Sequence, residues 1–108
     1  IGFSYGVQYA DVVWETNFIA TNGLTNFQID FAPYVTHPWE VAIENTTTTN
    51  SLNIFCKINQ TNYVSKTIRG GNTVTIAGTE NKPLEIQSFY LCNSSGASIR
   101  VYITFLGK

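Results

Sequence analysis

Ionisable side chains are few in this sequence, and their spacing does not suit catalysis. Glu40 and Glu44 would lie on one face of a strand, where four residues at roughly 3.3 Å each separate them by about 13 Å. The two carboxylates of a glycosidase lie only about 5–9.5 Å apart. We therefore expect Glu40 and Glu44 to be solvated charges at a sheet edge.

The single histidine, His37, carries no signal for a metal or for an activated nucleophile. It lies in Thr36-His37-Pro38, a pattern typical of an exposed loop. The sequence contains no cluster with the spacing of metal ligands, no glycine-rich phosphate loop and no nucleophile elbow. It predicts a protein that is not an enzyme and that binds no metal and no cofactor.

Two cysteines, Cys56 and Cys92, interrupt or end apolar strand patterns. An even number of cysteines in a sparsely charged chain favours an oxidising compartment. We predict a disulfide between them, worth roughly 3–4 kcal/mol in the chain-entropy model. The alternative is a pair of buried free thiols, because free cysteine is among the most buried residue types.

Three tripeptides match the acceptor sequence for N-linked glycans, and they begin at Asn45, Asn59 and Asn93. All three fall in expected turns, where a glycan would not disturb a strand. They are the predicted glycosylation sites in a host that glycosylates proteins.

Alternation with period two recurs along the chain, whereas no stretch shows the 3.6-residue period of a helix. Turn-forming residues separate the alternating segments. These segments are 1–10, 27–31, 39–44, 52–58, 63–68, 73–77, 84–91 and 98–106. They predict a single all-β domain over residues 1–108, an antiparallel β-sandwich of jelly-roll or immunoglobulin-like architecture with eight or nine short strands.

Composition narrows the classes of partner. Charged residues make up 12% of the chain, and the net charge of -1 offers no electrostatic footprint for nucleic acid or an acidic membrane. The longest apolar run covers residues 89–92, whereas a membrane-spanning helix needs about 20 apolar residues. Since the sequence contains no methionine, we expect that a secretory leader has been removed or that the chain has been trimmed. We predict an extracellular protein without nucleic-acid or membrane-inserted partners.

Aromatic residues reach 14% of the chain, and several lie near segment ends, where flat rings could stack on sugars. The candidates are Trp14, Tyr34, Trp39 and Tyr63. Both tryptophans keep the phase of the apolar residues of their segments, so we expect them on the core face. The aromatic residues near segment ends nevertheless leave a carbohydrate-binding module as one alternative function.

Residues 1–10 alternate without a break between large apolar and small or polar side chains. Ile1, Phe3, Tyr5, Val7 and Tyr9 would form one ridge, and the opposite face would be nearly bare. Such a ridge must be covered, either by its own domain or by a neighbouring copy. One interpretation makes residues 1–10 the first strand of a self-contained sandwich.

The other interpretation is β-strand donation to a neighbour. With its N-terminal ridge and sandwich composition, the chain resembles subunits of donor-strand-complemented surface filaments, both bacterial chaperone-pathway pilins and the thread-like glycosylated filaments of archaeal cell surfaces. The resemblance implies that the five ridge residues fill a groove in the next subunit. The partner would be a second copy, and head-to-tail contacts would give an open filament. A virion structural protein, such as a decoration, spike or small coat protein, is the other alternative.

Overall fold

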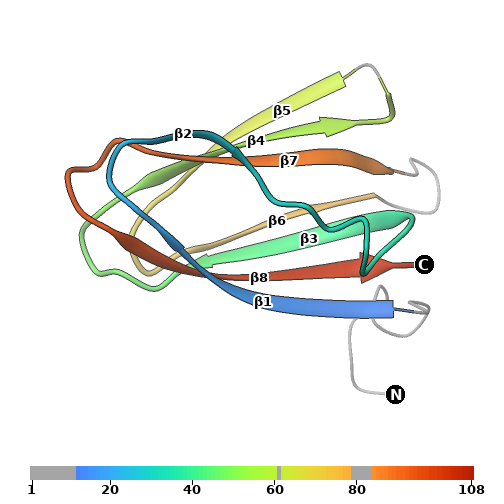
Figure 1. The fold of residues 1–108 in the computed structure, drawn as a ribbon, viewed down its shortest axis with the longest axis horizontal. Helices are drawn as coiled ribbons and strands as arrows, with labels where there is room; N and C mark the ends of the chain where they lie inside the picture. The colour runs from blue at the N-terminus through green and yellow to red at the C-terminus, as the bar shows by residue number, and fades with distance from the viewer. Residues whose placement is uncertain (1–11, 61, 79–83) are drawn as a thin grey trace.

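The computed structural model describes residues 12–60, 62–78 and 84–108, which form two packed antiparallel sheets (Figure 1). One sheet has the order β1-β8-β3-β6 and the other β2-β7-β4-β5. No helix occurs within these ranges, so none of them could span a membrane as a helix. The predicted all-β sandwich is confirmed. The strands are β1 (Val12–Ala20), β2 (Leu24–Gln28), β3 (Pro38–Asn45), β4 (Leu52–Ile58), β5 (Asn62–Ile68), β6 (Thr73–Ala77), β7 (Ile86–Asn93) and β8 (Ile99–Gly107).

The strand pairing distinguishes between the two expected architectures. β1 pairs with β8, β2 with β7, β3 with β6 and β4 with β5, as in one long hairpin that has been rolled up. This is the double-sheet arrangement of a jelly roll. In an immunoglobulin-like sandwich several consecutive strands pair directly, whereas here β4 and β5 are the only described consecutive strands that do so. The fold is therefore a jelly roll.

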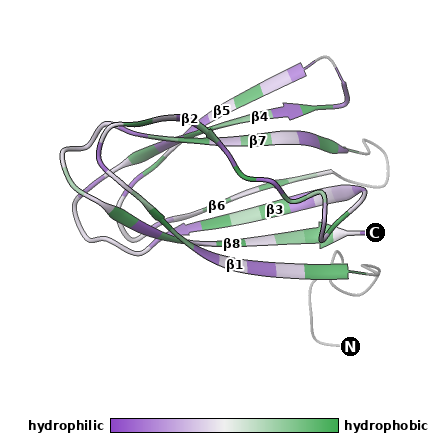
Figure 2. Cartoon of the chain, viewed as in Figure 1, coloured by the Kyte–Doolittle hydropathy of each residue, from purple (hydrophilic) through white to green (hydrophobic). Residues whose placement is uncertain are grey.

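The core lies between the inner faces of the central strands. Leu52, Ile54 and Cys56 of β4 are at most 1% exposed, and the odd-numbered residues of β8 from 99 to 105 are completely buried. Figure 2 shows the corresponding change between apolar and polar residues along β3 and β8. Because period two sends alternate side chains to opposite faces, the sequence pattern predicted these two rows.

The first described strand differs from the expected segments. β1 covers Val12–Ala20, which the sequence analysis did not count as a strand, and β2 covers Leu24–Gln28, three residues before the expected 27–31. The signal for β1 was present, since its even-numbered residues all point inward and its odd-numbered residues outward.

Four loops meet at one end of the sandwich, on the left in Figure 1, and join β1 to β2, β3 to β4, β5 to β6 and β7 to β8. The backbones of two of these loops touch at Gly70. A Cβ atom there would lie 2.7 Å from the carbonyl carbon of Thr48 and 2.8 Å from the amide nitrogen of Thr49. Only glycine permits this backbone contact.

Candidate functional site

The predicted donor residues Ile1, Phe3, Tyr5, Val7 and Tyr9 lie outside the described residues. The structure instead describes the sheet edges that could receive such a strand. The edge strands are β1 and β6 of one sheet and β2 and β5 of the other. An edge strand presents unpaired backbone groups unless charge, irregularity or shortness blunts it.

Three of these edges are blunted. β2 is interrupted by a register shift between Leu24 and Phe27, where Asn26 has a φ of 47°. β5 carries Lys66 opposite the inward-facing Ile54, so a charged side chain points toward the sheet interface from this edge. β6 is only five residues long. Inward-pointing charges, bulges and short strands are the devices by which proteins protect edges from pairing.

The β1 edge has no register shift and no inward-pointing charge, and it is not short; its one charged residue, Glu15, points outward. Its nine residues pair with β8 in continuous register, from Val12 opposite Gly107 to Ala20 opposite Ile99. On the outer face, Val13 is 51% exposed and Ile19 is 49% exposed. The strand contains no proline, lysine or glycine. It is the longest regular edge among the described strands.

An apolar seam runs beside β1, between the edges of the two sheets. Val12, Trp14 and Phe18 pack against the core but stay partly exposed. The ring of Phe18 stacks on Phe27 from β2 at 4.9 Å. Trp14 stacks on Tyr34 at 4.4 Å with the two rings 7° apart. We call these five residues the β1 seam.

Trp14 lies on the core face, as its phase predicted, and the core-face position of Trp39 stays a prediction. Trp14 is on the inner face, where it stacks between Tyr34 and the buried Phe105 at a centroid distance of 5.7 Å from the latter. Trp39 is partly buried at the point where the pairing of β3 with β8 shifts register, between Pro38 and Glu40. The Trp14 ring does not lie on an outer sheet face, where a sugar would find a flat platform.

Tyr63 lies on the outer face of β5 and is 56% exposed. Its ring stacks on Phe55 at 4.9 Å, and the Lys57 ammonium lies 5.9 Å from its centroid. Phe55 in turn contacts Tyr90 at 6.4 Å. The Tyr63 ring therefore packs against Phe55 of the neighbouring strand and is also exposed to solvent.

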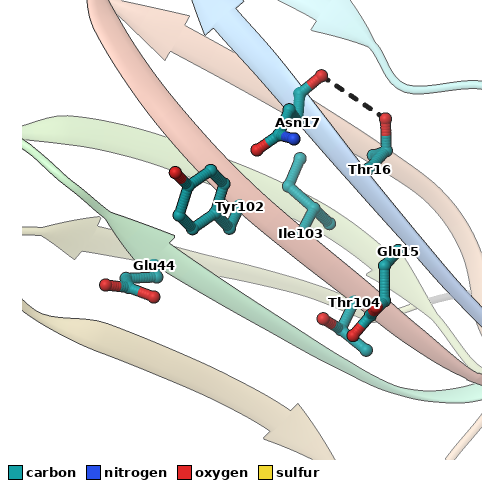
Figure 3. A pocket seen from close by; sticks show the side chains of 7 residues that line it. All are labelled: Glu15, Thr16, Asn17, Glu44, Tyr102, Ile103 and Thr104. Atoms are coloured by element: carbon teal, nitrogen blue, oxygen red, sulfur yellow. Dashed lines mark hydrogen bonds between the residues drawn. The ribbon is translucent and has the colours of Figure 1, made fainter.

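An open hollow of about 690 Å³ lies on the outer face of the other sheet (Figure 3). Glu15 and Glu44 line it from β1 and β3, and Tyr102 of β8 lies between these strands. Two strand spacings of roughly 4.8 Å keep the two glutamate backbones at least about 9.6 Å apart. The hollow does not bring the carboxylates together as a pair.

The interpretation of Glu40 and Glu44 as edge charges requires a correction. Their strand, β3, lies between β8 and β6 and is therefore not an edge. Both side chains nevertheless point away from the core, and Glu44 is exposed. Glu40 is partly buried, and this desolvation raises the pKa of its carboxyl group.

His37 lies in an exposed loop, as its sequence context predicted. Its Nδ1 atom is 3.4 Å from Oε2 of the exposed Glu85. An exposed pair of this kind contributes at most about 1 kcal/mol to stability. In the described part of the chain, no group of three or more His, Cys, Asp or Glu side chains could hold a metal ion.

The predicted Cys56–Cys92 disulfide is wrong, because both thiols are free. Cys56 points into the core from β4, whereas Cys92 lies beside the outward-facing Asn53. Positions 53 and 56 differ by three residues, or roughly 10 Å along the strand, and a disulfide tolerates Cα atoms only up to about 7 Å apart. Burial raises the pKa of the Cys56 thiol to about 12. The Cys92 thiol donates to Oδ1 of Asn26 at 3.3 Å.

Asn93, at the end of β7, is completely buried, which argues against its prediction as a glycan acceptor. Its Nδ2 atom donates to the carbonyl oxygens of Ala20 at 2.7 Å and Ala97 at 2.8 Å. Its Oδ1 atom accepts from the amide of Ser95 at 3.0 Å and from the Ser95 hydroxyl at 2.7 Å. A glycan on Nδ2 would disrupt these contacts in the interior.

Asn45, at the end of β3, repeats the arrangement and is also completely buried. Nδ2 donates to the carbonyls of Asn50 at 2.8 Å and Ile68 at 3.0 Å, and Oδ1 accepts from the amide and hydroxyl of Thr47 at 3.0 and 2.7 Å. Each asparagine thus joins a loop to a strand end of the opposite sheet. The hydroxyl residue that creates the glycan motif serves here as a hydrogen-bond partner of the asparagine.

Asn59, the third predicted acceptor, lies in the exposed turn after β4. Its Oδ1 atom accepts a hydrogen bond from the amide of Glu85 at 2.8 Å. Its exposure distinguishes it from Asn45 and Asn93, and glycosylation at Asn59 stays a prediction.

Comparisons with known proteins add to the description of the fold. No family model and no curated protein matches this chain. Its structure is similar to peruvianin-I, a cysteine peptidase from Thevetia peruviana latex, with a TM-score of 0.57, 13% identity and coverage of 89% of this chain and 51% of that one. The chain therefore spans about half the length of the peptidase.

Two weaker similarities have TM-scores below 0.5. The polyketide cyclase RemF from Streptomyces resistomycificus gives 0.49 at 16% identity, with coverage of 94% of this chain and 59% of the cyclase. A chain of the Bacillus endospore appendages, described as a novel family of disulfide-linked pili, gives 0.46 at 11% identity, with coverage of 90% and 88%. At such identities the similarity concerns the fold alone.

Proposed function

We propose that this chain is a non-catalytic structural subunit that assembles head-to-tail into an extracellular filament. Each subunit donates residues 1–10 as a β-strand to the next subunit. The observation that carries the proposal is the complete strand pairing: β1 to β8 form a full jelly roll within residues 12–107. Because the eight described strands already form the jelly-roll pairing, our proposal assigns the alternating segment 1–10 to a neighbour.

The energetics favour a covered ridge. Burial of a large apolar side chain contributes about 1.5–3 kcal/mol before ordering costs, and the ridge offers Ile1, Phe3, Tyr5, Val7 and Tyr9. Main-chain hydrogen bonds to an open edge would add affinity, and alternate side chains would give specificity. Because donor and acceptor surfaces differ, the contact is heterologous and generates an open chain of subunits.

The test replaces Phe3 and Val7 with aspartate. The two charges fall on the ridge, so this variant should fold but lose assembly, as observed by negative-stain electron microscopy. The matched control is Ser4→Asp with Gln8→Asp, which adds the same charges at the same spacing on the bare face and should still form filaments. Filaments of the Phe3→Asp, Val7→Asp protein would refute strand donation.

The jelly-roll pairing itself favours a second candidate, a virion structural protein, since jelly rolls are frequent in viral capsids. The same microscopy separates the two. Closed particles or rings, in place of open filaments, would support the virion role.

A further inference from the structure

We infer that the β1 edge is the acceptor of the donated strand, which pairs antiparallel to β1 with residues 1–9 opposite residues 20–12. This inference rests on the proposed function and names the surface of the partner subunit. The β1 edge is regular over nine residues, and the ridge segment Ile1–Tyr9 has the same length. Both extend roughly 30 Å as strands.

The inner faces of the two strands match in number. Five residues of β1 point inward, at even positions from 12 to 20, and five ridge residues occupy odd positions from 1 to 9. In the antiparallel register Tyr5 lies opposite the small Thr16, and Ile1 lies opposite the small Ala20. Phe3 lies opposite Phe18 as a cross-strand aromatic pair, an arrangement that stabilises sheets.

The β1 seam supplies the apolar surface that the ridge would cover. Val12, Trp14 and Phe18 stay partly exposed although they face inward. Phe27 is 40% exposed and Tyr34 is 55% exposed beside them. A strand added to β1 would lie along this seam and place its ridge over these rings.

The other edges fit the ridge less well. A strand on β5 would bring an apolar side chain next to the inward-pointing Lys66. β2 has the register shift before Phe27, and β6 offers only Thr73–Ala77 for pairing. These features disfavour a nine-residue partner strand on each of them.

The connection between the ridge and β1 favours a neighbour over the same chain. To fold back onto its own β1, the segment would need a two-residue turn at Ala10-Asp11. Such turns require residues that tolerate positive φ, usually Asn-Gly, Asp-Gly or Gly-Gly. Ala10 is unsuited to that position, whereas an extended Ala10-Asp11 would lead the ridge to the next subunit.

Cysteine cross-linking in assembled protein tests the edge and the register. In a Cys92→Ser background, Ser4→Cys with Asn17→Cys pairs directly opposite positions of the antiparallel register. The comparison variants are Ser4→Cys with Glu15→Cys, which suits a parallel strand, and Ser4→Cys with Ser65→Cys, which suits the β5 edge. Asn17, Glu15 and Ser65 are all exposed, so the replacements do not alter the core.

After oxidation, non-reducing electrophoresis should show a ladder of covalent oligomers for Asn17→Cys, at least several-fold stronger than for the other two variants. A dominant ladder with Glu15→Cys would overturn the antiparallel orientation. A ladder with Ser65→Cys, or filaments without a ladder in any variant, would overturn the β1 edge but leave filament assembly standing. A cross-link within single chains, with no filaments by microscopy, would overturn the proposed function as well.

Discussion

Replacing Asn93 with alanine should lower the free energy of unfolding by about 3–5 kcal/mol. The side chain makes four hydrogen bonds while completely buried, and a net contribution of about 1 kcal/mol each gives about 4 kcal/mol. The carbonyl of the buried Ala20 would also lose a partner. For a domain of this size the melting temperature should fall by more than about 10 °C.

The measurement is urea unfolding followed by tryptophan fluorescence, on protein made in a host without N-glycosylation. Because that host attaches no glycan, the decrease in the free energy of unfolding reports only the lost hydrogen bonds. Asn45→Ala should behave like Asn93→Ala, because its amide makes the same set of contacts. Asn17→Ala, at an exposed position of β1, is the control and should change stability by no more than about 0.5 kcal/mol. The reasoning is refuted if Asn93→Ala and Asn45→Ala stay within about 0.5 kcal/mol of the natural protein, the range of ordinary surface substitutions.

Two further predictions concern single groups. A thiol reagent should modify Cys92 in the native protein and Cys56 only after unfolding, because burial raises the pKa of the Cys56 thiol to about 12. If no thiol reacts even in denaturant, the two cysteines form a disulfide after all and this prediction is wrong. The folded-state pKa of Glu40 is raised above 4.5 by desolvation, so its ionised form destabilises the fold above that raised pKa, and the penalty disappears as the pH falls below 4.5. In urea unfolding, Glu40→Gln should therefore increase the free energy of unfolding at pH 7 but not at pH 4. Glu44→Gln, at an exposed position of the same face, is the control and should change little. Equal effects of Glu40→Gln at both pH values would contradict the prediction.

The core was predictable from the sequence because it depends on local alternation. The inward row of β8 and the row of β4 through Cys56 follow from period two alone. The strand order was not predictable, since β1 pairs with β8 across almost the whole chain and no local pattern specifies that partner.

The errors at the candidate site have similar causes. Side-chain parity could have excluded the disulfide, because Leu91 points inward and therefore turns Cys92 outward. The same parity could have placed Asn93, two residues after Leu91, and Asn45, two residues after Ile43, on the inward face, but it does not show what their amides would bind. Their buried amides bind the ends of strands that are distant in sequence, at Ile68 and Ala20, and only the folded chain brings these together.

The rolled pairing of the strands also governs the order of events in synthesis. β1 leaves the ribosome before the other described strands, but its only described partner strand, β8, ends at Gly107 and is the last of them to be made. Contacts of such high sequence separation make jelly rolls slow folders, on a scale of milliseconds to seconds. The β1 edge therefore does not exist until β8 has been made, so a nascent subunit cannot offer this edge to a neighbour's strand before that point.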